Sequence, residues 1–185
     1  MNPTKIAESQ DILDFWFSSK NADKRFQKDE AFDQEIWDRF GPTWIAACQG
    51  LLSHWRGDIY GRLAEIIVLD QFSRNLMRGD ARSYSQDGMA LILAQELVAH
   101  PNFEELTQEE RQFGLMPYMH SESAQIHEQA LSLFQEHTGE GTLHYEELHK
   151  ELIDRFGRYP HRNEVLGRTS SWEEIAYLKQ PDAGF

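Results

Sequence analysis

Apolar residues recur along this chain at intervals of three and four positions, which is the spacing of one face of an α-helix. The same periodicity returns from near the first residues to near the last. The segments that the pattern predicts to be helical are 12–17, 32–40, 42–48, 58–77, 87–99, 107–118, 126–134, 145–156 and 171–178.

Capping and breaking residues mark the ends of several predicted helices. Thr107 and Ser171 are each followed three positions later by glutamate, the arrangement of a capping box at a helix N-terminus. Gly157 favours the end of the helix before it, because glycine readily adopts the left-handed conformation of a C-terminal cap. Gly41-Pro42 predicts that one helix ends there and that a second helix begins at the proline.

The run from Leu63 to Leu69 is apolar on most sides, which predicts a buried central helix. A parallel strand can show the same short run, but other strand-like runs bounded by glycine or proline are absent. No linker is long enough to divide the chain, and no repeat period is visible. The sequence therefore predicts a single all-α domain spanning residues 1–185.

The net charge of −13 narrows the choice of partners. A nucleic-acid binder needs a basic face for phosphate contacts, and docking on an anionic membrane needs the same sign of charge, so neither partner is expected. Cys48 is the single cysteine, which excludes a disulfide within the chain. No apolar run is long enough for a signal peptide or a membrane span, so we expect a cytoplasmic protein.

One stretch runs against the acidic trend, because four arginines and two histidines fall between positions 149 and 168. Tyr159-Pro160 is expected to be extended, and the proline can open a short helical turn. Around that turn Arg158, His161 and Arg162 would form a pocket for a carboxylate or phosphate, since a planar guanidinium matches two oxygens at once. Asn163 would add neutral hydrogen bonds. Alternatively, these arginines pair with acidic residues and lock the C-terminal part of the fold.

A second group of arginines follows the apolar run. Arg74, Arg78 and Arg82 are spaced by four, so a continuous helix would align them on one face, although Gly79 interrupts the pattern. Asp70 precedes Arg74 by four positions and can pair with it. Charges this close to a buried helix need partners, because an unpaired buried charge is strongly destabilising. The group is therefore either an ion-pair network between helices or part of a ligand site.

Histidine and carboxylate residues are frequent between positions 120 and 149, but their spacing does not predict a metal site. Glu146 and His149 form an i, i+3 pair of the kind found in helical di-iron proteins, which need a second such pair and further carboxylates. We therefore expect no metal and no cofactor. Phosphate-binding loops and the nucleophile motif Gly-x-Ser-x-Gly are absent. The candidates for acid–base chemistry are His120, His149 and His161, with Asp70 or Glu122 as the orienting carboxylate.

Four blocks of this sequence resemble, in the same order, the pattern of a known bacterial family. They are Leu13-Asp14-Phe15-Trp16-Phe17, Leu69 to Asn75, His120-Ser121-Glu122 and Arg155 to Asn163. Together with 166–168 and 174–178, these blocks extend over nearly the whole chain. The chain therefore resembles the family called Domain of Unknown Function 924. The resemblance implies an all-α fold similar to tetratricopeptide-like right-handed superhelices, in which antiparallel helix hairpins stack. It implies no activity.

Two positions depart from the pattern of that family. Ser73 stands where proline is expected, and Tyr159 stands where phenylalanine is usual. The hydroxyl of Tyr159 is an added polar group that could face the candidate site.

The leading functional expectation is a binding module, in which a concave cleft holds a small anionic ligand or the carboxylate end of a peptide. Its ligand-binding residues would be Arg74, Asn75, Arg78, Arg155, Arg158, His161, Arg162 and Asn163. The first alternative is a hydrolase or lyase that acts on an anionic substrate through histidine and carboxylate acid–base chemistry. The second is a scaffold for a partner protein. The site requires the two arginine-rich segments to meet in space, and the sequence alone fixes neither that meeting nor the oligomeric state.

Overall fold

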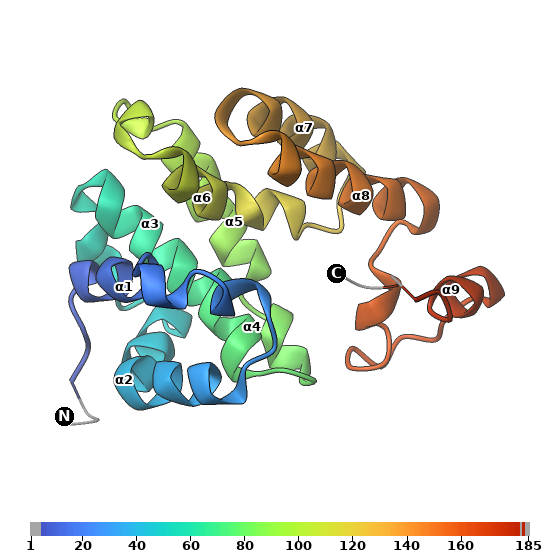
Figure 1. Ribbon diagram of the computed structural model, residues 1–185, viewed down its shortest axis with the longest axis horizontal. Coiled ribbons are helices and arrows are strands. Elements are labelled where there is room, and N and C mark those ends of the chain that lie inside the picture. Colours follow the sequence, from blue (N-terminus) through green and yellow to red (C-terminus); the bar gives the residue numbers. More distant parts are fainter. Residues whose placement is uncertain (1–4, 182, 184–185) are drawn as a thin grey trace.

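The regular structure of this protein is helical throughout the residues that its computed structural model describes, which are 5–181 and 183 (Figure 1). The predicted all-α fold is therefore confirmed. The α-helices are α1 (Ser9–Trp16), α2 (Glu30–Cys48), α3 (Ile59–Ile67), α4 (Ser73–Leu76), α5 (Asp87–Val98), α6 (Gln108–Met119), α7 (Ala124–His137), α8 (Glu140–Phe156) and α9 (Trp172–Tyr177). Shorter elements that matter for the site are a π-helix, η4 (Val68–Phe72), and two 3-10 helices, η5 (Ala81–Tyr84) and η7 (Pro160–Arg162).

Helix α3 lies in the middle of the fold and contacts α1, α5 and α6. From α5 onward each helix packs against the next, so that α5, α6, α7 and α8 form a consecutive stack (Figure 1). After α8 the chain turns back, and residues 157–181, which we call the C-terminal segment, lie beside the lower end of α8 (Figure 1). This segment holds η7 and α9 and brings them next to the stack.

Aromatic rings dominate the core of the N-terminal part. Phe72 is fully buried and its ring lies 5.6 Å from that of Phe40 and 5.7 Å from that of Trp16, measured between centroids. Phe15 stacks on Phe32 in the same cluster at 5.4 Å. The apolar run from Leu63 to Leu69, predicted to be a central helix, is buried along its whole length, although the first turn of α3 exposes Tyr60.

The predicted break at Gly41-Pro42 is wrong. Helix α2 continues through both residues to Cys48. The residue before a proline normally avoids the helical region because its Cβ clashes with the proline ring, and Gly41 has no Cβ. Buried side chains on both sides of the proline, among them Phe40 and Trp44, also face the same core, so packing keeps the helix continuous.

The predicted helix over 58–77 is present as a continuous helical course from 59 to 76, but it is not a regular α-helix, because α3 passes into the π-helical turn η4 and then into α4. The hydroxyl of Ser73 donates to the carbonyl oxygen of Leu69 (2.5 Å) and accepts from Trp44 Nε1 (3.0 Å). Gly79 has a φ of +74°, which ends the helical course beyond Leu76. Arg74, Arg78 and Arg82 consequently do not share one helix face.

Several predicted helix ends are confirmed. The capping boxes at Thr107 and Ser171 are both present, at the starts of α6 and α9. Gly157 adopts the left-handed conformation (φ 68°) directly after α8. Within the described part of the chain, no helix is both long and apolar enough to cross a membrane.

Candidate acid–base site at the junction of the arginine-rich segments

A buried carboxylate contacts a histidine at the end of α6. Asp70, in η4, is fully buried, and its Oδ1 lies 2.7 Å from Nδ1 of His120. Arg74 Nη1 lies 3.0 Å from the same oxygen, and Gln71 Nε2 donates to the other oxygen at 2.5 Å. Because three side chains hold this carboxylate, it can fix the orientation of the imidazole ring.

The surroundings favour an ionised Asp70 and a neutral His120. Burial alone would raise the pKa of Asp70, but the charge of Arg74 and the contact with His120 together bring it below its usual range. Burial lowers the pKa of His120, and the positive charge of Arg74 lowers it further against the opposing effect of Asp70. At neutral pH the ring therefore carries one proton. With that proton on Nδ1, donated to Asp70, the lone pair is on Nε2.

The two arginine-rich segments meet at Asp87, the first residue of α5. Arg74 makes a bidentate contact with this carboxylate at 2.9 and 3.1 Å, and Arg162 reaches it at 3.3 Å. The guanidinium of Arg162 lies between two aromatic rings, 4.5 Å from the centroid of Tyr84 and 4.4 Å from that of Tyr159. This stacking holds the fork of Arg162 in one plane.

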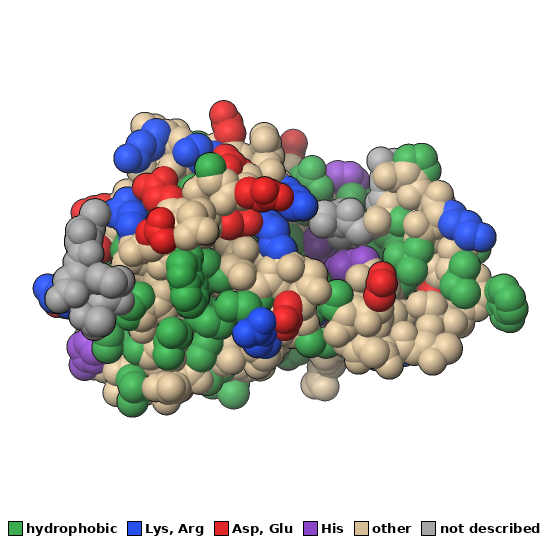
Figure 2. Space-filling view, turned by 90° about the horizontal axis from the view of Figure 1, so that it is seen from below, with side chains coloured by type: hydrophobic (Ala, Val, Ile, Leu, Met, Phe, Trp, Pro, Cys, Tyr) green, Lys and Arg blue, Asp and Glu red, His purple; other side chains and the backbone are tan. Residues whose placement is uncertain are grey.

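A cavity of about 480 Å³ opens beside this junction. The polar part of its wall comes from Tyr84, Ser85, Asp87, His120, Ser121, Glu122 and Arg162. Leu91 and Leu166 supply apolar surface. In Figure 2, basic and histidine side chains gather near the middle of the face, where the N-terminal helices meet the C-terminal segment. The His120 ring therefore lies at the wall of a space large enough for a small molecule, with an arginine beside it.

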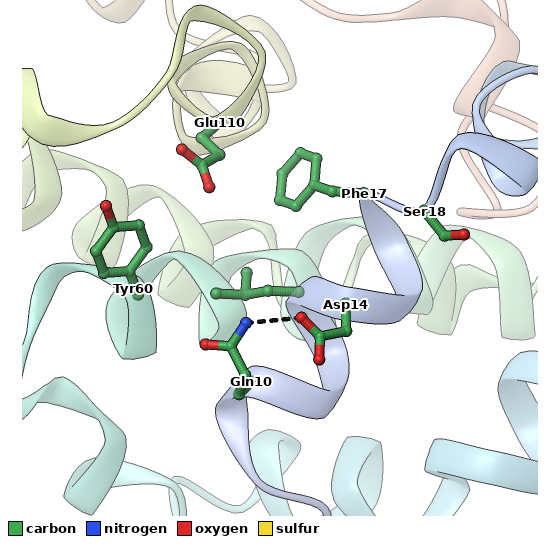
Figure 3. A pocket seen from close by; sticks show the side chains of 7 residues that line it. Gln10, Asp14, Phe17, Ser18, Tyr60 and Glu110 are labelled. Carbon is green, nitrogen blue, oxygen red and sulfur yellow. Dashed lines mark hydrogen bonds between the residues drawn. The ribbon is translucent and has the colours of Figure 1, made fainter.

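A second cavity of similar volume lies over α1 and is lined by Gln10, Leu13, Asp14, Phe17, Ser18, Tyr60 and Glu110 (Figure 3). Gln10 donates to Asp14 at 2.8 Å, which satisfies part of that carboxylate. The described lining contains neither histidine nor arginine. These described residues therefore offer neither an imidazole for acid–base chemistry nor a cation for an anionic ligand.

The last residue of α6, its C-terminal cap His120 and the two residues after it form a segment, which we call the 119–122 loop, that is held by side chains from elsewhere. The Tyr159 hydroxyl donates to the carbonyl oxygen of Met119 at 2.5 Å, and Arg162 Nη2 donates to that of His120 at 3.0 Å. His127 Nε2 lies 2.9 Å from the carbonyl oxygen of Ser121. Carbonyl groups at a helix C-terminus lack helical partners, so these contacts both satisfy them and fix the loop.

Glu122 anchors the loop to the C-terminal segment. Its carboxylate accepts two hydrogen bonds from Arg168, at 2.6 and 3.0 Å, and one from the backbone nitrogen of Tyr159 at 2.8 Å. Partial burial opposes ionisation of Glu122, but these bonds lower its pKa on balance. Glu122 therefore fastens the loop and does not contact the ring of His120 through any described hydrogen bond.

Seven of the eight predicted ligand-binding residues lie outside the described lining of this cavity, and Arg162 is the one that lines it. Arg74 lies next to the lining through its contact with Asp87, and His161 packs on the ring of Tyr159. Asn75 and Arg78 both donate to Asp33 of α2 and tie α4 to that helix. The other three lie in the last turn of α8 or after it. Arg158 forms a bidentate pair with Glu174 (2.7 and 2.8 Å), Asn163 bonds Ser170 and Arg168, and exposed Arg155 lies over the ring of Phe156.

The other two candidate histidines stack around Tyr159. His161 lies parallel to its ring at 5.5 Å, and His149 meets its edge at 5.6 Å. Burial lowers the pKa of His161 to about 4 and that of His149 to about 3. Of the three histidines proposed for acid–base chemistry, only His120 is found among the described residues that line the cavity.

Comparison with known proteins places the fold in a family. Over residues 12–182 the sequence matches the family described as bacterial protein of unknown function (DUF924). The chain belongs to this family. A solved structure of a protein of unknown function from Agrobacterium tumefaciens is 37% identical and superimposes with a TM-score of 0.87, covering 92% of this chain and 96% of that chain. None of the curated proteins matches.

The predicted resemblance to this DUF924 family is thus confirmed, and the family leaves the activity open. Sequence reasoning missed Asp87, Tyr84 and the partnership of His127 with Glu146. Asp87 carried a weak signal, because an acidic residue opens the predicted helix over 87–99. Among the described residues, no group of three or more histidine, cysteine or carboxylate side chains is arranged to hold a metal ion.

Proposed function

We propose that this protein is an enzyme, a hydrolase or lyase that acts on a small anionic substrate with His120 as its acid–base group. The observation that carries the proposal is the 2.7 Å contact between buried Asp70 and Nδ1 of a histidine at the cavity wall. A carboxylate that orients a neutral imidazole toward a cavity is a recurring arrangement in acid–base catalysis.

The chemistry follows from the protonation states. His120 Nε2 would accept a proton from a water molecule or from the substrate, and Asp70 would stabilise the imidazolium that forms. Arg74 keeps Asp70 ionised, so the carboxylate remains a charge partner and does not take the proton itself. The proton on Nε2 is then available for the leaving group.

An anionic substrate is favoured by Arg162, whose guanidinium is at the cavity wall. Its Nε is buried without a hydrogen-bond partner among the described residues. Leu91 and Leu166 would contact an apolar portion of the substrate. Asp87 and Glu122 on the same wall limit the negative charge that the cavity tolerates, which favours one anionic group over several.

Binding without chemistry is the second candidate, and Arg162 is the observation that favours it. The wider arginine cluster supports it less, because Arg74 is committed to Asp70 and Asp87, and Arg158 is committed to Glu174. A cytoplasmic location, a tetratricopeptide-like superhelix and a role as a partner-protein scaffold stay predictions.

The test is an activity screen with chromogenic esters, phosphate esters and small hydroxy acids, using wild type, His120→Gln and Asp70→Asn. Because general acid–base catalysis contributes about 10²–10⁴-fold, His120→Gln should lose activity by that factor. The matched control is His144→Gln, since the His144 side chain is 66% exposed and should be silent.

A compound that raises the unfolding temperature of wild type and His120→Gln equally, with no turnover by wild type, would favour the binding module. Turnover that survives in folded His120→Gln would exclude His120 as the acid–base group.

A further inference from the structure

A buried histidine–glutamate pair lies in the hairpin of α7 and α8, next to the site, and takes no part in the proposed acid–base chemistry. His127 of α7 and Glu146 of α8 are both fully buried, and His127 Nδ1 lies 2.6 Å from Glu146 Oε1. Neither residue is among the described lining of the cavity. Burying two such groups is costly unless their hydrogen bonds are well made, so the pair needs an explanation.

The contacts of the ring fix where its protons are. Nδ1 faces the carboxylate, and Nε2 faces the carbonyl oxygen of Ser121 at 2.9 Å, which can only accept. Nε2 also lies 3.1 Å from the hydroxyl oxygen of Tyr159, whose proton is donated to Met119. Both ring nitrogens therefore face acceptors, while a neutral imidazole carries one proton.

One additional proton resolves this conflict. Either the ring is an imidazolium facing a carboxylate, or Glu146 is protonated and donates to Nδ1. Burial raises the pKa of Glu146 against the opposing effect of its bond to His127, so the acid readily retains a proton. In both states Nε2–H points at Ser121, and the shared proton is what keeps it there.

We infer that His127 and Glu146 are positioning residues that hold the 119–122 loop, and with it His120, through one shared proton. The inference rests on the proposed function only for the role of His120. If the shared proton were lost, the one proton left on the imidazole would be on Nδ1, where it is donated to the ionised Glu146. Nε2 would then carry a lone pair that faces the carbonyl oxygen of Ser121. The loop would then lose a donor one residue from His120.

The groups that face the pair are few. Tyr159 lies against the ring, and burial raises its pKa, so it stays neutral. His149 and Lys150 of α8 are the neighbouring titratable groups on that helix. Burial lowers the pKa of His149 to about 3, so it is uncharged above that pH, whereas Lys150 acts on Glu146 through its positive charge. Lys150 is thus the cation that favours the ionised form of Glu146.

The test reads His120 directly and needs no substrate. In the full-length, ¹⁵N-labelled protein, long-range ¹H–¹⁵N spectra report the tautomer and the titration of each imidazole. His127→Leu removes the donor, and His120 should lose its fixed Nδ1–H tautomer and titrate closer to an ordinary histidine, at about 6.5. His127→Gln retains an N–H that can reach Ser121 and should restore the wild-type His120 signals.

A second comparison keeps the idea testable if His127→Leu does not fold. Glu146→Gln supplies a permanent N–H donor to Nδ1, so its His120 signals should not change as the pH rises. Those of the wild type should change over the pH range in which the shared proton leaves. Identical His120 behaviour in wild type and folded His127→Leu, or identical pH curves in wild type and Glu146→Gln, would overturn the inference. A failed activity screen with these shifts present would overturn the proposed function alone.

Discussion

The N-terminal helices and the C-terminal segment are held in place by different forces. The core formed by α1 to α6 contains stacked and edge-on aromatic rings and a long series of fully buried aliphatic side chains. The C-terminal segment shares a small apolar cluster of four buried residues, Leu152, Ile153, Tyr159 and Tyr177. Polar contacts also tie it to the rest of the fold: ion pairs join Arg162 to Asp87 and Arg168 to Glu122, and the Tyr159 hydroxyl donates to Met119. The pair of Arg158 with Glu174 lies within the segment and holds α9 to its start.

The difference explains where the candidate site formed. Apolar burial stabilises strongly but is not directional, so it sets the position of helices more than the orientation of a ring. Ion pairs and hydrogen bonds contribute less net stability, yet they fix angles and distances. His120 lies where the apolar core meets the C-terminal segment. Asp70, which is buried in the core, contacts its ring, and Arg162 of the C-terminal segment donates to its carbonyl oxygen.

The largest expected effect is on the aromatic core. Phe72→Ala should destabilise the protein by about 3–5 kcal/mol, because the surrounding rings cannot close the cavity that remains. Urea unfolding followed by far-UV circular dichroism measures the loss. A loss below about 1 kcal/mol, the size expected for removing one buried methyl group, would mean that the neighbouring rings repack into the space that Phe72 leaves.

Breaking the link between the two regions should come next. Asp70→Asn removes a fully buried charge that Arg74 and His120 share, at a cost of about 3 kcal/mol. The pKa of His120 should fall further in this variant, since the negative charge that raises it is gone. Urea unfolding and an imidazole titration by NMR give both numbers. An unchanged or raised pKa of His120 would contradict the described electrostatics.

Acid should destabilise the protein through the histidines around Tyr159. The folded-state pKa of His161 is about 4, below the unfolded value of about 6.5, so the unfolded chain binds more protons between these pH values. Stability should be level above pH 6.5 and decline below it, by about 2.6 kcal/mol from His161 alone at pH 4.5. His161→Gln should reduce the slope between pH 6.5 and pH 4.5. An equal slope in wild type and variant would show that His161 is not held neutral.

The smallest global effect is expected at Arg158. The Arg158 side chain is 31% exposed, which screens its charge, and its buried partner Glu174 keeps the hydrogen bond from the backbone nitrogen of Ser171, so Arg158→Gln should lower the unfolding midpoint only modestly. Hydrogen exchange in α9 should nevertheless become faster, because the pair with Glu174 is one of the few ties of this helix. Exchange measured by mass spectrometry on peptides from 169–178 tests it. Unaltered exchange would place the anchoring of α9 in its apolar contacts.

The contrast between apolar packing and directional polar contacts also decides what could be predicted from the sequence. Periodicity identified the helices because each apolar face is a local pattern, and it failed at Gly41-Pro42 because a glycine before the proline and packing on both sides outweighed the usual breaking signal. Asp70 and His120 were candidates from residue type alone. Their contact, and the bridge from Arg74 through Asp87 to Arg162, join positions 50, 13 and 75 residues apart, and no local pattern encodes such distances.

The π-helical turn of η4 also sets the rotation of everything that follows it. A bond to the fifth residue places one more residue in that turn than an α-helix would hold, and one residue corresponds to about 100° of rotation. Beyond the turn, Arg74 reaches Asp87 while Asn75 and Arg78 reach Asp33 on a different helix. Deleting a single residue from η4 would swing these side chains by that angle. The extra residue in η4 therefore orients α4 and the residues after it, so that their side chains reach two different helices, α5 and α2.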